Sequence, residues 1–232
     1  MTSIGAALKV LQNAEGSDGR STINVSGACR ENVVIQSMDR LTLIAGQGAS
    51  INDPSGGTLS TVTIDDSRDV VIDGFTINGG TDGIDCQDGS VCRVNGNTIQ
   101  GAVNGYGVGV FFSQLFLDGG TLQNNGTGLA AINGATAKAT NVTIQNNSGG
   151  IEIRTQSFVK RTLSCPGCQI TGNGGIGVIL RRDSSARLYS TYAVTGNTGG
   201  GILLTEESSA YFPSATGTVP QAVIYFDHLD FR

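Results

Sequence analysis

The sequence predicts an all-β solenoid in which each coil supplies three short strands and a short helix closes the N-terminal end. A glycine-led apolar strand recurs every 21 to 26 residues from residue 83 onward, which is a repeat length typical of stacked architectures. Units of this size cannot bury an apolar face alone, and stacking them creates one continuous interior. Charged residues make up only 14% of the chain and 35 residues are glycine, a composition that suits short strands joined by tight corners.

Composition also excludes several function classes. The net charge of −5 argues against nucleic acid or an anionic membrane surface as a partner. No apolar run approaches the ~18 residues that a membrane-spanning helix needs, so membrane insertion is not expected. His228 is the single histidine, which excludes metal motifs built on two histidines. We therefore expect no metal and no cofactor, with Ca²⁺ as the one ion that neighbouring carboxylates could hold.

At the N-terminus, residues 3–12 are expected to form a short amphipathic helix. Ser3 is a suitable N-cap, and Ile4, Leu8 and Leu11 fall on one helical face. The segment lacks the basic start and long apolar core of a secretory signal. The whole chain, 1–232, is predicted to be one domain: this capping helix, coils over 20–218, and a C-terminal cap or tail over 219–232.

The first strand of each unit begins with a glycine and then alternates apolar and variable positions, which is the period of a β-strand. Its instances begin at Gly83, Gly107, Gly128, Gly150, Gly175 and Gly201. Counted from these glycines, the alternation directs Asp85, Glu152 and Arg154 outward, and in the fifth unit Gly177 and Ile179.

A strand–corner–strand pattern follows in each unit, as in Cys92–Ile99 with its Asn-Gly corner. By alternation, Cys86, Cys92, Cys165 and Cys168 all point inward and behave as small apolar residues. The spacing leaves their oxidation state open, and Cys165–Cys168 also has the C-x-x-C form of a redox or half-zinc site.

Polar side chains recur at fixed places as well. A column of asparagines is expected to hydrogen-bond from coil to coil at one corner, formed by Asn125, Asn147, Asn173 and Asn197. Threonines at 76, 98, 121 and 143 form a flat outward face. Regular hydroxyls could bind sugar or ice, but threonine is also simply suited to exposed strands, and the second interpretation is favoured.

These glycine-led steps, Asp/Asn-Gly corners and asparagines resemble the right-handed parallel β-helix, or pectin-lyase-like, superfamily over about residues 20–218. The resemblance implies a single-stranded right-handed parallel β-helix, with the active cleft of its enzymes on the sheet built from the glycine-led strands. The superfamily includes lyases, hydrolases, epimerases, adhesins and tailspikes, so it does not by itself imply one activity. It also implies a secreted or periplasmic location.

Candidate site residues are taken from the outward positions of that sheet and from charged residues close to them in the sequence. The catalytic candidates are Asp65, Asp85, Asp88 and Arg93, with Asp82 and Arg68 nearby. The carbohydrate-binding candidates are Phe111, Glu152 and Arg154. Asp85 and Glu152 should lie three coils and thus about 14 Å apart, which is too far for a glycosidase carboxylate pair.

The segment Thr81–Asp85 is similar to the first catalytic motif of polygalacturonases, but the Asp-Asp, Gly-His-Gly and Arg-Ile-Lys motifs that should follow are missing. The favoured hypothesis is therefore a non-catalytic extracytoplasmic scaffold or adhesin-like module that contacts polysaccharide. The alternatives are a polysaccharide lyase or glycoside hydrolase using aspartates around Asp85, and a purely structural or engineered solenoid. Four outward apolar residues would form a contiguous stripe: Phe111, Ile132, Ile179 and Leu203. The C-terminal tail or self-association should cover it, giving a monomer or a homotrimer.

Overall fold

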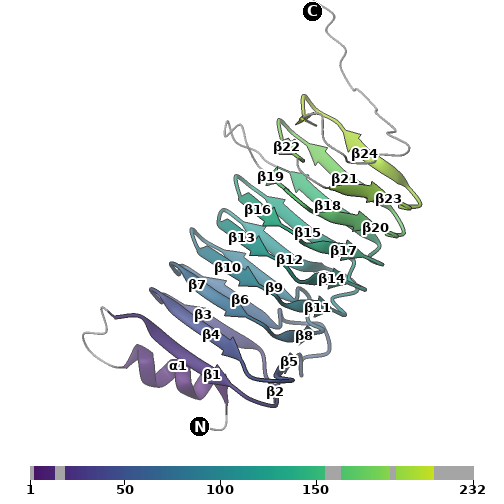
Figure 1. Cartoon of the computed structure of the whole chain (residues 1–232). Helices are drawn as coiled ribbons and strands as arrows, with labels where there is room; N and C mark the ends of the chain where they lie inside the picture. Colours follow the sequence, from purple (N-terminus) through teal and green to yellow (C-terminus); the bar gives the residue numbers. More distant parts are fainter. Residues whose placement is uncertain (1–2, 14–18, 155–162, 189–191, 212–232) are drawn as a thin grey trace, which may run out of the picture.

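The computed structural model describes residues 3–13, 19–154, 163–188 and 192–211. The chain coils into a parallel β-solenoid whose three sheets enclose one interior, with a helix at the N-terminal end (Figure 1). Each coil passes through the three sheets in the same order, so strand partners are separated by one full coil in sequence. The predicted fold class and three strands per coil are confirmed.

Sheet A is the longest of the three. Its strands, in spatial order, are β1 (Ser21–Val25), β4 (Leu41–Ala45), β7 (Val70–Asp73), β10 (Val91–Asn95), β13 (Gln114–Asp118), β16 (Thr136–Thr140), β19 (Leu163–Ser164), β22 (Ser185–Arg187) and β25 (Ser209–Tyr211).

Sheet B consists of strands of three residues. They are β2 (Ala28–Arg30), β5 (Ser50–Asn52), β8 (Thr76–Asn78), β11 (Thr98–Gln100), β14 (Thr121–Gln123), β17 (Thr143–Gln145), β20 (Gln169–Thr171) and β23 (Ala193–Thr195).

Sheet C is formed by the glycine-led strands. They are β3 (Val33–Gln36), β6 (Val62–Asp65), β9 (Ile84–Gln87), β12 (Tyr106–Phe111), β15 (Thr127–Ile132), β18 (Gly149–Arg154), β21 (Ile176–Arg181) and β24 (Gly200–Leu204).

The N-terminal helix α1 (Ile4–Gln12) covers the first coil. Ser3 caps it by accepting the Ala6 N–H, and Ile4 and Leu8 are buried against the core, as predicted. Such a cover protects the interior and the strand edges that an open solenoid end would expose. The predicted C-terminal cap over 219–232 lies outside the described residues.

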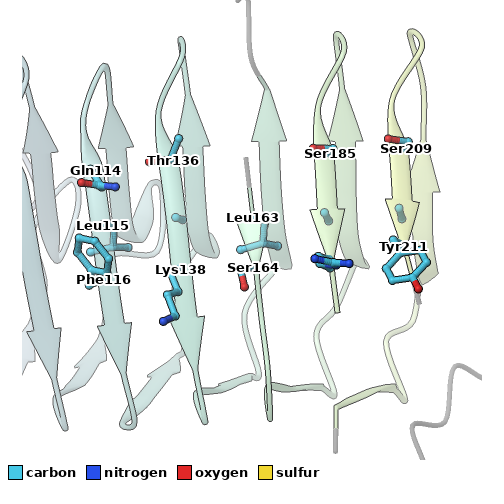
Figure 2. Close-up of a pocket in the computed structure, with 14 residues that line it drawn as sticks. Gln114, Leu115, Phe116, Thr136, Lys138, Leu163, Ser164, Ser185, Ser209 and Tyr211 are labelled. Carbon is cyan, nitrogen blue, oxygen red and sulfur yellow. The ribbon is translucent and has the colours of Figure 1, made fainter. Parts of the chain in front are cut away.

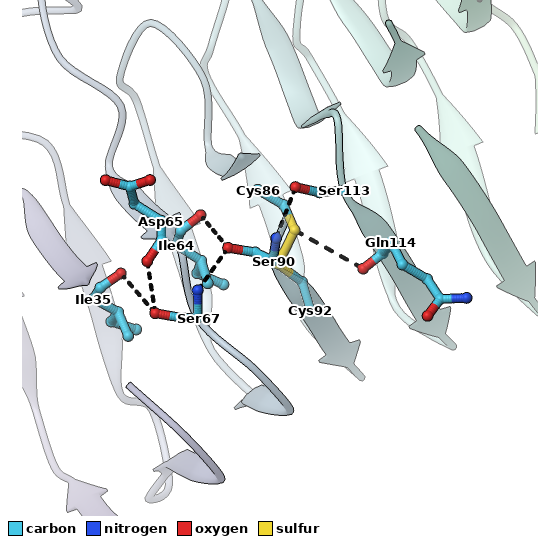
Figure 3. Close-up of a disulfide and its surroundings, with 9 residues drawn as sticks. All are labelled: Ile35, Ile64, Asp65, Ser67, Cys86, Ser90, Cys92, Ser113 and Gln114. Carbon is cyan, nitrogen blue, oxygen red and sulfur yellow. Dashed lines mark hydrogen bonds between the residues drawn. A yellow bond between two sulfur atoms is a disulfide. The ribbon is translucent and has the colours of Figure 1, made fainter. Parts of the chain in front are cut away.

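All four predicted interior cysteines are buried, and they form two disulfides, Cys86–Cys92 and Cys165–Cys168. The first joins β9 of sheet C to β10 of sheet A, across the corner where Ser90 lies (Figure 3). Serines form a ladder along this corner: Ser90 Oγ accepts the Ser67 N–H at 3.0 Å, and Ser113 Oγ accepts the Ser90 N–H at 3.1 Å. The repeat pattern did not reveal this serine ladder.

The asparagine column is confirmed as a buried ladder. Asn147 Oδ1 accepts the Asn125 backbone N–H at 2.9 Å and its side-chain amide at 3.1 Å. The Asn147 side-chain amide donates to the Leu122 carbonyl at 3.0 Å and to Asn173 Oδ1 at 3.0 Å. Each side chain therefore satisfies two backbone groups of the preceding coil and bonds to the asparagine of the following coil, at a corner from which water is excluded.

A second, outward amide ladder runs along sheet B. Gln123 donates to Gln100 at 2.9 Å, and Gln145 donates to Gln123 at 3.2 Å. These side chains are half-buried, so their bonds compete with water. The threonines expected beside them, from Thr76 to Thr143, are also aligned strand to strand.

The repeated glycine of sheet C marks the closest approach of consecutive coils. A β-carbon on Gly150 would lie 2.2 Å from the Gly177 carbonyl oxygen and 2.8 Å from Ile170 Cγ2. The partner of Gly150 in the next coil is therefore Gly177. Starting the fifth glycine-led strand at Gly175, as expected from the sequence, was wrong by two residues. The strand register agrees, because Glu152 pairs with Ile179 and Arg154 pairs with Arg181.

Replacing Gly150 with alanine is expected to destabilise the protein by about 1 to 3 kcal/mol, since the new methyl group collides with backbone that cannot rotate away. Chemical denaturation checks this. Gly89→Ala offers no useful control because of its positive φ, whereas Gly19 has open space around it. Gly19→Ala should leave stability nearly unchanged; equal losses at both positions would contradict the packing explanation.

Candidate functional site

A group of carboxylates lies on sheet C where β6, β9 and β12 run side by side. Asp85 points outward from β9 and pairs in register with Thr63 on one side and Gly109 on the other. Asp65 lies on β6, diagonally across from Asp85, in register with Gln87. Two consecutive coils therefore carry the aspartates, as the sequence predicted.

Asp82 is the buried member of this group, on the outer face of sheet C. It is 7% exposed, and its Oδ1 accepts the Tyr106 backbone N–H at 2.7 Å. Its other oxygen lies over Gly109, where a β-carbon would come within 3.2 Å of Asp82 Oδ2 and 2.9 Å of Phe111 Cε2. The missing side chain at Gly109 thus lets the Asp82 carboxylate and the Phe111 ring approach the strand beside Asp85.

This arrangement changes the pKa of two aspartates, Asp85 and Asp82. Burial, followed by the charges of Asp82, Asp65 and Asp88, raises the pKa of Asp85 to about 7. No described group donates a hydrogen bond to the buried Asp85 Oδ1, so nothing nearby offsets the desolvation of its charge. Burial also raises the pKa of Asp82, opposed by the Tyr106 N–H. Asp85 is therefore a proton donor or acceptor suited to neutral pH.

The remaining acidic candidates lie around Asp85 in different settings. Asp65 is half-buried and accepts a hydrogen bond from Gln36 at 2.9 Å. Asp88 is exposed in the corner after β9, with a φ of 54°. Its charge contributes to the field at Asp85, but its own position is a left-handed turn that asparagine or aspartate adopts readily.

The two arginines proposed to assist these aspartates do not join them. Arg93 lies on β10 of sheet A, where it forms an ion pair with Asp69 and stacks over the Phe116 ring at 4.7 Å. Arg68 is exposed at the corner between sheets C and A. The expected role of Arg93 in the site is therefore wrong. Arg93 is close to Asp85 in the sequence, but the corner between β9 and β10 turns it onto another face of the solenoid.

The carbohydrate-binding candidates form one connected cluster further along sheet C. The Phe111 ring is 6.1 Å from the Tyr106 ring, and the Tyr106 hydroxyl is 3.3 Å from Arg154 Nη2. Arg154 also pairs with Glu152 at 3.2 Å. Ala130 faces outward within this cluster yet is fully buried, so the larger side chains around it close over it. Tyr106 connects the aspartates to the cluster.

Asp82, Tyr106 and Gly109 are the parts of this site that the sequence analysis did not assign together. Asp82 was grouped with the other aspartates, but its bond to Tyr106 depends on how one coil docks on the next.

The corrected register also divides the expected apolar stripe: Phe111 and Ile132 share one column, which continues into Arg154 and Arg181. Ile179 belongs to the neighbouring outward column, where it pairs in register with Glu152 of the preceding coil. Phe111, Ile132 and Ile179 are only half-exposed in the single chain.

Within the described ranges, no three histidine, cysteine or carboxylate side chains are grouped so that they could hold a metal ion. No described helix has the length and apolar character needed to cross a membrane.

Comparison with known proteins shows the family of the fold. The family model for the right-handed beta helix region matches residues 60–215. No curated protein matches the chain. Among solved structures, a candidate glycosyl hydrolase from Parabacteroides merdae is 14% identical, with a TM-score of 0.25 and coverage of 92% of this chain and 88% of its own.

Proposed function

The chain belongs to the right-handed β-helix family, and we propose that it hydrolyses a polysaccharide at the carboxylates of sheet C. The observation that carries this proposal is Asp85, whose pKa of about 7 leaves it partly protonated at neutral pH. A protonated carboxyl group beside an ionised one is what glycoside hydrolysis requires. We further propose a secreted or periplasmic location, which the two disulfides favour.

Asp85 is the proposed general acid and Asp65 the proposed general base. Neighbouring strands lie about 4.8 Å apart and two residues along a strand span about 6.6 Å, so the Cα atoms of Asp65 and Asp85 lie about 8 Å apart on the diagonal. Both side chains point outward from the same face of the sheet, so their carboxyl groups are expected at a similar spacing. A separation of about 6.5 to 9.5 Å leaves room for a water molecule and is typical of inverting glycosidases. Asp85 would protonate the leaving oxygen while Asp65 activates water on the opposite face of the sugar.

The cluster of Phe111, Tyr106, Arg154 and Glu152 would bind neighbouring sugars. An aromatic ring offers an apolar face for sugar C–H groups, and the Arg154–Glu152 pair supplies donors and acceptors for hydroxyls. Arg154 is held by both Tyr106 and Glu152, so the surface is arranged before a ligand arrives. This preorganisation is also the observation that favours a second candidate function, a non-catalytic module that contacts polysaccharide.

The test is a screen of neutral and acidic polysaccharides for new reducing ends and for the unsaturated products of lyases. We expect new reducing ends without unsaturation, and a rate that falls as the pH rises through about 7, because Asp85 must be protonated to act as the acid. Unsaturated products would replace the hydrolase with a lyase. Binding without any product would favour the non-catalytic module.

A further inference from the structure

Sheet A carries a shallow groove on a different face from the aspartates. It has a volume of about 790 Å³ and crosses β13, β16, β19, β22 and β25 (Figure 2). Because it runs across the strands, it follows the axis of the solenoid, and four coil steps of about 4.8 Å give it a length of about 19 Å. It was not anticipated from the sequence.

Two rows of outward side chains form the sides of the groove (Figure 2). One row carries short polar groups, with Gln114, Thr136, Ser185 and Ser209. The other row carries mostly larger side chains and contains Phe116, Lys138, Ser164, Arg187 and Tyr211. Strand register, not sequence spacing, brings each row into line.

The charge of the groove is opposite to that of the protein. Among the residues that the structure describes, no carboxylate lines it, although the chain has 19 acidic and 14 basic residues. Within the described part of the chain, neither Lys138 nor Arg187 forms an ion pair. Asp118, on the same sheet, lines a separate hollow with Lys138 and Arg93. Both cations are exposed and available to an anion.

Aromatic rings stand at the two ends of this row. Tyr211 is 53% exposed and has the Arg187 guanidinium 5.0 Å from its ring centre. Phe116 is half-buried beneath Arg93 at the other end. Flat rings next to cations and hydroxyls match a ligand that has apolar C–H faces, hydroxyl groups and negative charges.

We propose that this groove binds an acidic oligosaccharide chain, with Lys138 and Arg187 contacting its carboxylates. An extended peptide is a poorer match because it would need an unpaired strand edge, and the groove crosses strands that are already paired. Single-stranded nucleic acid is a poorer match because its backbone is normally neutralised by many cations along a positive groove. The site stands on its own observations and goes beyond the hydrolysis proposed for sheet C.

The experiment measures binding of oligogalacturonate, a neutral galactan oligosaccharide of similar length, and oligo(dT) by calorimetry. The protein is the full chain carrying Asp85→Asn, so that cleavage does not interfere. We expect the oligogalacturonate to bind, with affinity falling as salt rises, and the neutral sugar to bind at least about tenfold more weakly, since hydrogen bonds to charged groups contribute most.

Lys138→Ala with Arg187→Ala should reduce oligogalacturonate affinity by at least about tenfold. The matched control, Arg30→Ala with Arg68→Ala, removes two exposed cations outside the groove and should change affinity less than about twofold. Lys138→Glu provides a single-site check in case the double variant folds poorly.

Three outcomes would overturn the proposal: no binding of oligogalacturonate, equal losses in the groove and control variants, or oligo(dT) binding at least as tightly. Loss of hydrolysis in Asp85→Asn with groove binding retained would separate this site from the proposed function, and failure to find any hydrolysis would leave the groove test unaffected.

Discussion

Replacing Asp85 with asparagine is expected to abolish hydrolysis and, at the same time, to stabilise the protein above neutral pH. Asparagine cannot donate the proton, and general acid catalysis contributes about 10² to 10⁴ in rate. The stability effect follows from the raised pKa of about 7, compared with about 3.9 in the unfolded chain. The folded protein therefore binds the proton more tightly, and its stability decreases as the pH rises from about 4 through 7.

Asparagine cannot ionise, so the variant does not lose this stability as the pH rises. The full pKa difference corresponds to about 4 kcal/mol, and partial solvent exposure of Asp85 reduces the expected gain to about 2 kcal/mol at pH 8. At pH 4 the variant and the natural protein should have nearly equal free energies of unfolding, because Asp85 is then protonated in the folded protein and about half protonated in the unfolded chain. Urea denaturation at the two pH values measures the difference.

The matched control is Asp88→Asn, which makes the same chemical change in the corner directly after β9, where the side chain is exposed rather than half-buried. This variant should retain most activity and show no stability gain that grows with pH. Removing the Asp88 charge should also lower the pKa of Asp85 slightly. Destabilisation of Asp85→Asn at every pH would mean that Asp85 has a structural role, and unchanged activity would exclude it as the acid.

Replacing Asn147 with alanine is expected to cost about 3 to 5 kcal/mol of stability, the largest structural effect predicted for this chain. The substitution leaves the Asn125 backbone N–H and the Leu122 carbonyl without their partners. Both bonds are buried at the asparagine corner, so water does not replace them. It also ends the ladder between Asn125 and Asn173. Each buried polar group left unpaired costs about 1 to 3 kcal/mol.

Gln145→Ala is the control, two residues earlier in the same coil. Gln145 belongs to the outward amide ladder on sheet B, and water can replace its bond to Gln123. We expect a loss below about 1 kcal/mol. Similar losses for Asn147→Ala and Gln145→Ala in chemical denaturation would show that burial does not distinguish the two ladders.

The periodicity of the sequence determined the solenoid, its capping helix, the buried cysteines and the asparagine ladder. The capping helix follows from its own N-cap and helical spacing. The other features depend on which residue types occupy the same place in successive coils, and a repeat makes that place visible along the chain. The outward position of Asp85 follows from the same alternation. Where the repeat becomes ambiguous, as at Gly175 and Gly177, the sequence alone chose the wrong register, because both glycines precede an apolar residue.

Only the tertiary structure decided what surrounds the outward residues. Arg93 follows Asp85 closely in sequence, yet a corner places it on sheet A, whereas Tyr106 reaches Arg154 from 48 residues away. The raised pKa of Asp85 depends on Asp82 and on burial that sequence does not display. The groove on sheet A likewise exists only after stacking, because residues one coil apart become neighbours at about 4.8 Å. Contacts within a coil follow from the chain, but contacts between coils follow from register, and the site and the groove are both made between coils.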